Sequence, residues 1–212
     1  MSQLPSTYTD LHRVGLADTR ELVVVEQFAL RPSSSSSIAS PAWIKAADDP
    51  AARIAVVTLN DPANLNALSP ALMLQLHYKL ADLVRNPQIR AIILTGSGPG
   101  FCSGGSLDMI KSGAEMVHAG VHDFATPGGG TAEPWRFIRM QFGGVVRLIA
   151  NSNVLFVAAV NGPAAGVGLA LALACDCVLA SKEHAVFVPA FAKLGLVPEV
   201  GTSWLLTKKF CF

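Results

Sequence analysis

The chain of 212 residues is 51% hydrophobic and 15% charged, a composition typical of one globular domain with a substantial core. Lys and Arg total 16 against 15 for Asp and Glu, and this near-balance argues against a nucleic-acid-binding protein, which would carry a clustered basic excess. The four cysteines lack the paired CxxC spacing of a zinc site, and Asn, Gly, Pro and Asp interrupt every long apolar run before it could cross a membrane. We therefore expect a soluble, intracellular protein with reduced thiols and no metal.

The N-terminal part predicts two strands joined by a surface loop. ELVVVEQFAL (21–30) and ARIAVVTLN (52–60) are rich in β-branched residues. The proline-bounded segment between them contains five consecutive serines, which is typical of a flexible linker.

A helix and a buried strand come next. In 69–87, Ser69 is a suitable N-cap, a proline takes the first helical position, apolar residues recur at helical spacing, and an Asn-Pro pair ends the pattern. RAIILTG (90–96) then reads as a buried strand. Strand, helix and strand at these lengths predict parallel pairing through a helical crossover.

The remaining elements follow the same alternation. We expect a surface loop with a short helical piece (111–133), a helix weakened by two glycines (135–151), a buried strand (153–160), a glycine-rich turn and apolar helix (161–176), two short strands (177–188), and a turn with the start of a helix (194–209). Twice, therefore, a strand ends in glycines that lead toward a helix.

The two glycine-rich junctions, 96–106 and 161–168, do not fit the common glycine motifs. A P-loop needs a lysine that the first junction lacks, and a dinucleotide fingerprint needs glycine where Phe101 stands. The second junction has no serine for a nucleophile elbow. Bare backbone from two loops instead suits an oxyanion hole, in which two amide groups stabilise one developing negative charge.

Four segments resemble the crotonase, or enoyl-CoA hydratase/isomerase, superfamily in the family's own order. They are PANLNALS (62–69), GSGPGFCSGGSL (96–107), AAVNGPAAGVGLALALACDCVLAS (158–181) and FAKLGLVPEVGTSWLL (191–206). The resemblance covers about residues 50–206 and implies a single α/β domain built as a spiral of β-β-α repeats. Residues 1–50 would supply an N-terminal strand and the serine-rich loop, and 51–206 the core. Members of the family continue beyond this point, so we expect the C-terminal helical region to be missing.

The resemblance also implies a ligand and its binding residues. The substrate would be an acyl-CoA thioester, with no separate cofactor because coenzyme A is part of the substrate. The amides of Ser103 and Val167 would hold the thioester carbonyl as it becomes an enolate. The implied substrate-binding residues are Asn66, Ala67, Leu68, Ser103, Gly104, Gly105, Gly166 and Val167. The family's assembly would be a homo-trimer or hexamer.

One carboxylate remains for proton transfer. Hydratases of the family use two glutamates, whose positions here hold Ala170 and Phe191, so hydration by two carboxylates is not expected. Glu199 follows the proline of LGLVPE, where the branch of single-acid enoyl-CoA isomerases carries its acid. This resemblance favours an isomerase that moves a 3-enoyl-CoA double bond to the 2-position, with Glu199 as the proton shuttle.

An apolar environment would help that acid. We expect Phe191, Leu196, Val197 and Trp204 to enclose Glu199 and to raise its pKa by desolvation. By residue type alone, a carboxylate in a turn is more often solvated.

Several alternatives stay open. The chain could be a hydratase or another acyl-CoA lyase with an unassigned acid, or a catalytically silent subunit that binds acyl-CoA or a partner. His118 and His122 have the spacing of zinc histidines but lack the accompanying glutamate, so an exposed loop is favoured. Asp176 is interpreted as a structural carboxylate. The apolar surface near Trp204, Leu205 and Leu206 would lack a cover.

Overall fold

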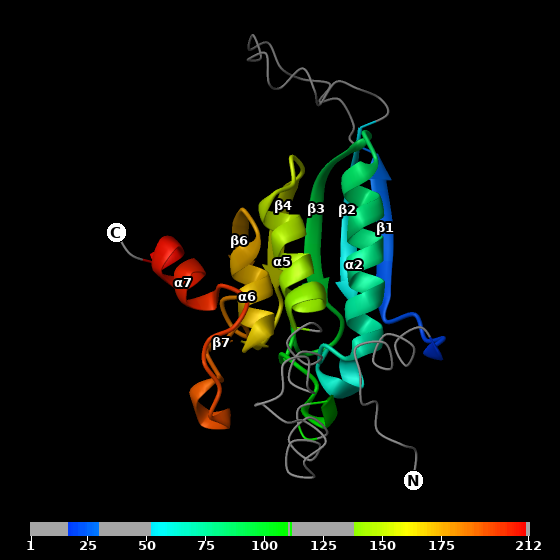
Figure 1. The fold of residues 1–212 in the computed structure, drawn as a ribbon. Coiled ribbons are helices and arrows are strands. Elements are labelled where there is room, and N and C mark those ends of the chain that lie inside the picture. The colour runs from blue at the N-terminus through cyan, green and yellow to red at the C-terminus, as the bar shows by residue number, and fades with distance from the viewer. Residues whose placement is uncertain (1–16, 30–51, 110, 112–137, 211–212) are drawn as a thin grey trace, which may run out of the picture.

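A five-stranded sheet organises the described part of the chain (Figure 1). The computed structural model describes residues 17–29, 52–109, 111 and 138–210. The strands are β1 (Val23–Ala29), β2 (Arg53–Leu59), β3 (Ile89–Gly96), β4 (Leu155–Val160) and β6 (Cys177–Ala180), in the order β1-β2-β3-β4-β6. β1 pairs antiparallel with β2, and every later pair is parallel. The predicted parallel pairing across the first helix is confirmed.

Short second strands complete a repeating unit. β5 (Ala164–Ala165) and β7 (Phe187–Val188) pair parallel in a separate two-stranded sheet, and Cys102 forms an isolated parallel bridge with Ala164. Each of these short pieces lies between a long strand and the next helical segment. The described residues thus form the α/β fold expected from the sequence, with β-β-α units following one another along the chain.

The longer α-helices of the described residues accompany the main sheet. They are α2 (Pro70–Arg85), α5 (Gly143–Ala150), α6 (Val167–Ala174) and α7 (Thr202–Phe210). α2, α5 and α6 lie over one face of the sheet, whereas α7 lies at the far end beyond β6 (Figure 1). α7 packs on α6 through Leu205, which contacts Leu169 and Leu173. The structure therefore buries Leu205, while Trp204 is 62% exposed.

The sequence determines both ends of α2. The hydroxyl of Ser69 accepts a hydrogen bond from the Leu72 amide (3.2 Å), and proline follows at the first helical position. The helix ends at Arg85 because Asn86, before a proline, has an extended backbone. The predicted helix is confirmed, two residues shorter than expected at its C-terminal end.

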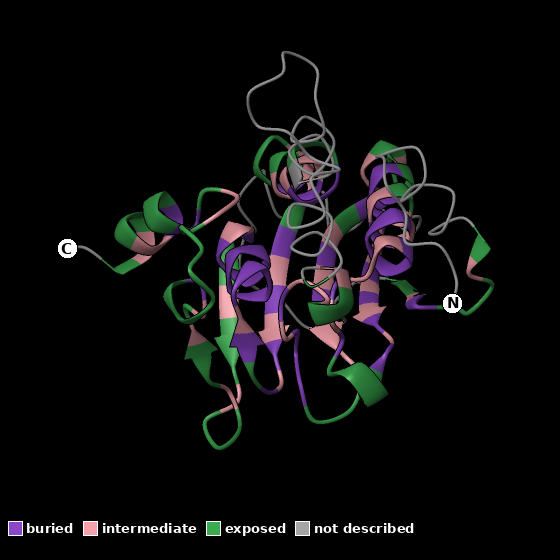
Figure 2. Cartoon of the chain, turned by 60° about the horizontal axis from the view of Figure 1, so that its bottom comes forward, coloured by how far each residue is buried: buried purple, intermediate pink, exposed green. Residues whose placement is uncertain are grey.

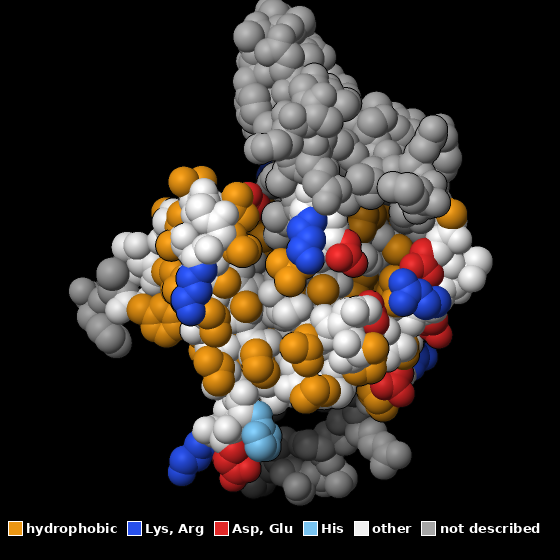
Figure 3. Space-filling view, turned by 90° about the horizontal axis from the view of Figure 1, so that it is seen from below, with side chains coloured by type: hydrophobic (Ala, Val, Ile, Leu, Met, Phe, Trp, Pro, Cys, Tyr) orange, Lys and Arg blue, Asp and Glu red, His pale blue; other side chains and the backbone are white. Residues whose placement is uncertain are grey.

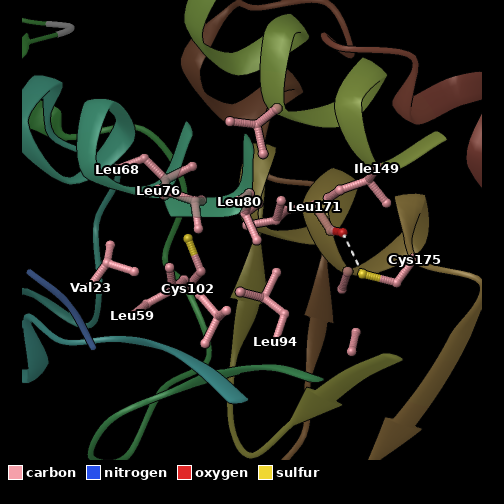
Figure 4. Packing of buried hydrophobic residues seen from close by; sticks show 14 of the residues in the cluster. Val23, Leu59, Leu68, Leu76, Leu80, Leu94, Cys102, Ile149, Leu171 and Cys175 are labelled. Atoms are coloured by element: carbon pink, nitrogen blue, oxygen red, sulfur yellow. Dashed lines mark hydrogen bonds between the residues drawn. The ribbon is translucent and has the colours of Figure 1, made fainter. Parts of the chain in front are cut away.

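The core lies between these helices and the sheet. Inward positions alternate along each strand: Ala55, Val57 and Leu59 in β2, and Ile92 and Leu94 in β3, are fully buried. Figure 2 shows this buried layer continuing through α2 and α6, and Figure 4 shows some of its side chains between the helices and the sheet. Burial of each large side chain contributes about 1.5–3 kcal/mol, so this layer supplies most of the favourable free energy of folding.

The helix predicted for 135–151 differs from the structure. Ile138–Phe142 form a π-helical turn, and α5 begins directly at Gly143. The absence of a side chain at Gly144 matters for packing, since a Cβ there would lie 3.4 Å from the His77 ring. The glycines thus let α5 approach α2 closely. The predicted loop 111–133, the serine-rich loop, and both His118 and His122 lie outside the described residues.

His77 makes stability depend on pH. Burial against α5, with a smaller effect of Arg85, lowers the pKa of this imidazole, and its Nδ1 atom has no hydrogen-bond partner within the described chain. Below pH ~6.5 the unfolded chain therefore takes up a proton that the folded protein resists. We expect the free energy of unfolding to fall as pH drops through this range, and His77→Gln to flatten the slope. Urea unfolding of the wild type and His77→Gln from pH 8 to 5 measures how the free energy of unfolding depends on pH. The same pH dependence in both proteins would contradict the prediction.

Candidate active site

The two glycine-rich junctions lie side by side, as the sequence predicts for an oxyanion hole. The amides of Phe101 and Cys102 both donate to the Pro163 carbonyl at 3.1 Å, and the Ala165 amide donates to the Cys102 carbonyl at 2.9 Å. These bonds join the loop that follows β3 to the turn that precedes α6. The backbone around Ser103 and the start of α6 is thereby brought together.

Gly104 shows how tightly the two junctions pack. Its φ is +100°, and a Cβ at this position would lie 2.8 Å from the Ala165 carbonyl oxygen and 3.7 Å from the Val167 nitrogen. Only glycine combines this backbone conformation with so close an approach. The first junction therefore runs directly beside the Val167 amide.

Val167 is the first residue of α6 and is buried. Its amide has no hydrogen-bond partner within the described residues, which is the usual condition of an N–H in the first helical turn. The N-terminal end of a helix also carries positive potential. An oxyanion beside Gly104 would thus meet a free, favourably charged donor at Val167.

Ser103 already donates two hydrogen bonds to the backbone in this structure. Its amide donates to the Leu65 carbonyl at 3.0 Å, and its hydroxyl donates to the Asn64 carbonyl at 3.3 Å. Leu65 is 42% exposed and has the left-handed φ of 50°. The Ser103 amide can donate to a ligand carbonyl only if it first gives up its hydrogen bond to the Leu65 carbonyl. Sequence reasoning did not predict this contact, because no local pattern links residues 65 and 103.

The segment predicted to contact coenzyme A is largely internal. Asn66 is fully buried, Leu68 is 1% exposed, and the Leu68 amide donates to the Gly104 carbonyl at 2.7 Å. Ala67 is only partly buried. The side chains of Asn66 and Leu68 therefore support the first junction from inside the protein, and the coenzyme A contacts of this segment stay predictions. The remaining predicted binding residues, Gly105 and Gly166, lie in the two junctions themselves.

Glu199 lies on the segment that leads into α7. Its side chain is half-buried, and burial raises the pKa of the carboxyl group. The carbonyl of Glu199 accepts hydrogen bonds from the amide (2.9 Å) and the hydroxyl (2.5 Å) of Thr202, which is fully buried. Between them, Val200 has a φ of 47°, an unusual conformation for a β-branched residue. A hydrogen-bonded turn anchored by the buried Thr202 thus fixes the backbone that carries the acid.

The enclosure predicted for Glu199 is wrong in part. Leu196, Val197 and Trp204 are 37%, 76% and 62% exposed, whereas Phe191 is buried in the main core. Leu196 and Val197 belong to the segment between β7 and α7, and Trp204 lies in α7, so these three side chains leave much of their surface in solvent instead of forming a closed apolar pocket. Figure 3 shows hydrophobic side chains between scattered charges over one face of the molecule.

The two positions where the family resemblance implies the glutamates of hydratases are apolar and buried. Ala170 lies in α6 with no exposed surface, and Phe191 is 5% exposed. Neither position is exposed to the solvent that an ionised acid would need. Asp176 is structural, as interpreted from the sequence, because its carboxylate accepts the Phe156 amide at 2.8 Å.

Two further residues support the site and were missed by sequence reasoning. Asn161 follows β4 and binds the first glycine-rich loop through its side-chain amide, and Thr202 binds the Glu199 carbonyl. A polar residue directly after a buried strand is the signal that could have identified Asn161. Within the described residues there is no group of three metal-binding side chains and no helix able to span a membrane.

The buried thiols are not nucleophiles. Burial raises the pKa of Cys102 and of Cys175 to about 12, so both stay protonated near neutral pH. Cys177 is exposed. We expect iodoacetamide at pH 8 to modify Cys177 in the native protein and to spare Cys102 and Cys175, as measured by peptide mass mapping. Equal labelling of all three would show that the core opens readily.

Comparisons with known proteins agree with this geometry. Residues 49–212 match the enoyl-CoA hydratase/isomerase family. The chain is 34% identical over 155 residues to the "Probable enoyl-CoA hydratase EchA14" of Mycobacterium tuberculosis, and 35% identical over 155 residues to the 1,2-epoxyphenylacetyl-CoA isomerase of Escherichia coli. In both cases the match covers 73% of this chain and 54% of the relative.

A solved structure shows the same fold. The enoyl-CoA hydratase from Mycobacterium avium subsp. paratuberculosis K-10 superposes with a TM-score of 0.58 at 33% identity, covering 73% of this chain and 53% of that one. The chain spans about half the length of the curated relatives it matches. The sequence match and the shared architecture lead to one conclusion: the chain belongs to the enoyl-CoA hydratase/isomerase family of the crotonase superfamily.

Proposed function

We propose that this protein isomerises an enoyl-CoA, moving a double bond from the 3-position to the 2-position of the acyl chain. The observation that carries the proposal is the Val167 amide beside the Gly104 loop, which has no hydrogen-bond partner among the described residues, with Glu199 as an acid of raised pKa. A 1,3-proton shift needs one group that accepts and returns a proton, and it needs no activated water.

The proposed steps conserve every atom of the substrate. The thioester carbonyl displaces the Leu65 carbonyl from the Ser103 amide and accepts a second hydrogen bond from Val167. The Glu199 carboxylate removes a proton from C2, and the electron pair of that C–H bond delocalises into a dienolate whose oxygen the two amides stabilise. Glu199 then returns the proton to C4, which leaves the double bond between C2 and C3.

Glu199 suits this role because of its partial burial. A carboxylic acid with a raised pKa is a stronger base once ionised, and its proton affinity lies nearer to that of the carbon acid. The bonds from Thr202 hold the backbone of the residue without consuming its side-chain oxygens. The carboxylate thus stays available for proton transfer.

Hydration is the second candidate, and the hydratase names of several relatives favour it. The apolar Ala170 and Phe191 weigh against it, because no carboxylate remains at either position to activate water. Binding of acyl-CoA without turnover is the third candidate. A homo-trimer or hexamer is the assembly we propose, to be tested by analytical ultracentrifugation.

The proposal is tested by offering the protein 3-hexenoyl-CoA and 2-hexenoyl-CoA separately in deuterium oxide. An isomerase converts the first into the conjugated thioester, read by ultraviolet absorbance, without adding the elements of water, read by mass spectrometry. Formation of 3-hydroxyhexanoyl-CoA would instead identify a hydratase. Saturable binding in calorimetry with no chemical change would identify a silent binding protein.

A further inference from the structure

We propose that Asn66 and Asn161 form an asparagine clamp, a pair of side-chain amides that grips the first glycine-rich loop and positions the Ser103 amide. Its catalytic consequence rests on the proposed function above. The clamp itself is a property of the fold, since its hydrogen bonds run from the two side chains to the backbone of the loop.

Asn66 supplies the inner half of the clamp. Its side chain is fully buried, and its Nδ2 atom donates to the carbonyls of Ser97 and Gly100, both at 2.9 Å. Its Oδ1 atom accepts the Asp61 amide at 2.8 Å. Both N–H groups of this side-chain amide and its oxygen therefore form hydrogen bonds within the protein.

The backbone around Asn66 is adapted to the same purpose. Asn66 has a φ of 55°, a left-handed conformation that asparagine tolerates better than most residues. A Cβ at Gly96 would lie 2.7 Å from the Asn66 Nδ2 atom, so glycine at 96 leaves the space for the side chain. The residue before Asn66 is Leu65, whose carbonyl binds the Ser103 amide. Asn66 thus sets the positions of both partners in that bond.

Asn161 supplies the outer half from the other side of the loop. Its Nδ2 atom donates to the carbonyls of Gly98 (3.0 Å) and Gly100 (3.3 Å). Its Oδ1 atom accepts the Gly96 amide at 3.2 Å. Asn161 directly follows β4, whereas Asn66 lies in the link between β2 and α2, so the two side chains come from the connections that follow the two strands flanking β3.

The two halves meet at one atom. The Gly100 carbonyl oxygen accepts a hydrogen bond from Asn66 and another from Asn161. Gly100 directly precedes Phe101 and Cys102, whose amides bind the Pro163 carbonyl, and Ser103 follows. Fixing this carbonyl therefore fixes the start of the three-residue path that ends at the Ser103 amide.

The chemistry requires an amide side chain at both positions. Each residue donates to two carbonyls and accepts from one N–H, which a carboxylate cannot do because it has no donor. Replacement of either asparagine by aspartate keeps the shape but turns the Nδ2 contacts into oxygen–oxygen contacts. Loss of these hydrogen bonds leaves the loop carbonyls without donors, and we expect the loop to be released.

Amide hydrogen exchange measured by NMR tests the clamp without any substrate. In Asn161→Asp, we expect the amides of Phe101, Cys102 and Ser103 to exchange about tenfold faster or more, while Ile92 and Leu94 in β3 stay unchanged. Asn66→Asp should do the same, and the double variant should fall short of the product of the two effects because both residues share one acceptor. Asn86→Asp is the matched control, since the Asn86 side chain accepts the Gln88 amide and a carboxylate can replace it.

Infrared spectra of bound hexanoyl-CoA with a carbon-13 thioester carbonyl give the functional readout. The clamp variants should move the carbonyl frequency toward its value in water, with kcat reduced more than KM is changed. Unchanged exchange at 101–103 in Asn161→Asp, or equal acceleration in Asn86→Asp, would overturn the clamp. Faster loop exchange in variants of a protein that neither binds nor converts acyl-CoA would uphold the clamp and refute the proposed function instead.

Discussion

Replacing Glu199 with glutamine is expected to lower kcat for double-bond migration about 10²–10⁴-fold, the usual contribution of a general base. The half-buried carboxyl group is isosteric with the amide, and the Thr202 bonds reach its backbone carbonyl, so the turn before α7 is preserved. Stopped assays of 3-hexenoyl-CoA conjugation measure the loss. Glu183→Gln, which alters an exposed carboxylate, is the matched control and should keep full activity.

The stability of Glu199→Gln shows whether its loss of kcat arises from the missing base or from unfolding of the protein. Because burial raises the Glu199 pKa, the folded protein holds a proton that the unfolded chain releases, and stability falls as pH rises from ~4.3 through the folded-state pKa. Glutamine is uncharged and does not incur the free-energy cost of a half-buried carboxylate. Glu199→Gln should therefore be at least as stable as the wild type at pH 7. In the wild type, kcat/KM should fall as pH drops through the Glu199 pKa. Full activity in Glu199→Gln would refute its role as the base.

Replacing Gly104 with alanine is expected to have the second large effect. The new Cβ would meet the Ala165 carbonyl at 2.8 Å, and a φ of +100° is strained for alanine. The first junction must therefore move away from Val167, which separates the paired donors. Loss of one oxyanion donor costs about 10²–10³-fold in kcat, and we expect a reduction of this size together with about 1–3 kcal/mol of lost stability.

Gly195 provides the control for backbone strain alone. It has a φ of +68°, but a Cβ there would meet no atom within 4 Å. Gly195→Ala should cost a similar strain energy in urea unfolding while leaving thioester binding intact. If Gly104→Ala kept wild-type kcat, the close approach of the two junctions would have no catalytic role.

Local sequence patterns predicted the repeated elements well. α2 was expected from Ser69, the proline after it and the Asn-Pro stop, and these same features cap the observed helix. β3 and β4 were expected from apolar β-branched runs that the structure buries beneath the helices. In contrast, no local pattern in the sequence predicts the π-helical turn before α5.

The site was predictable in its outline and not in its contacts. Glycines at two strand ends indicated where bare backbone would converge, and the structure brings Gly104 beside Val167. The bond from Ser103 to Leu65 and the clamp of Asn66 and Asn161 join residues separated by more than 30 positions. Such contacts arise from tertiary packing, so propensity and spacing cannot reveal them.

The pairing of the Ser103 and Val167 amides is tested most directly by the infrared frequency of a carbon-13-labelled thioester carbonyl in bound hexanoyl-CoA. Two hydrogen bonds should polarise the carbonyl and shift its stretching frequency below that of the free thioester in water, and Gly104→Ala should abolish the shift. A bound thioester whose carbonyl absorbs at the same frequency as in water would contradict the oxyanion hole.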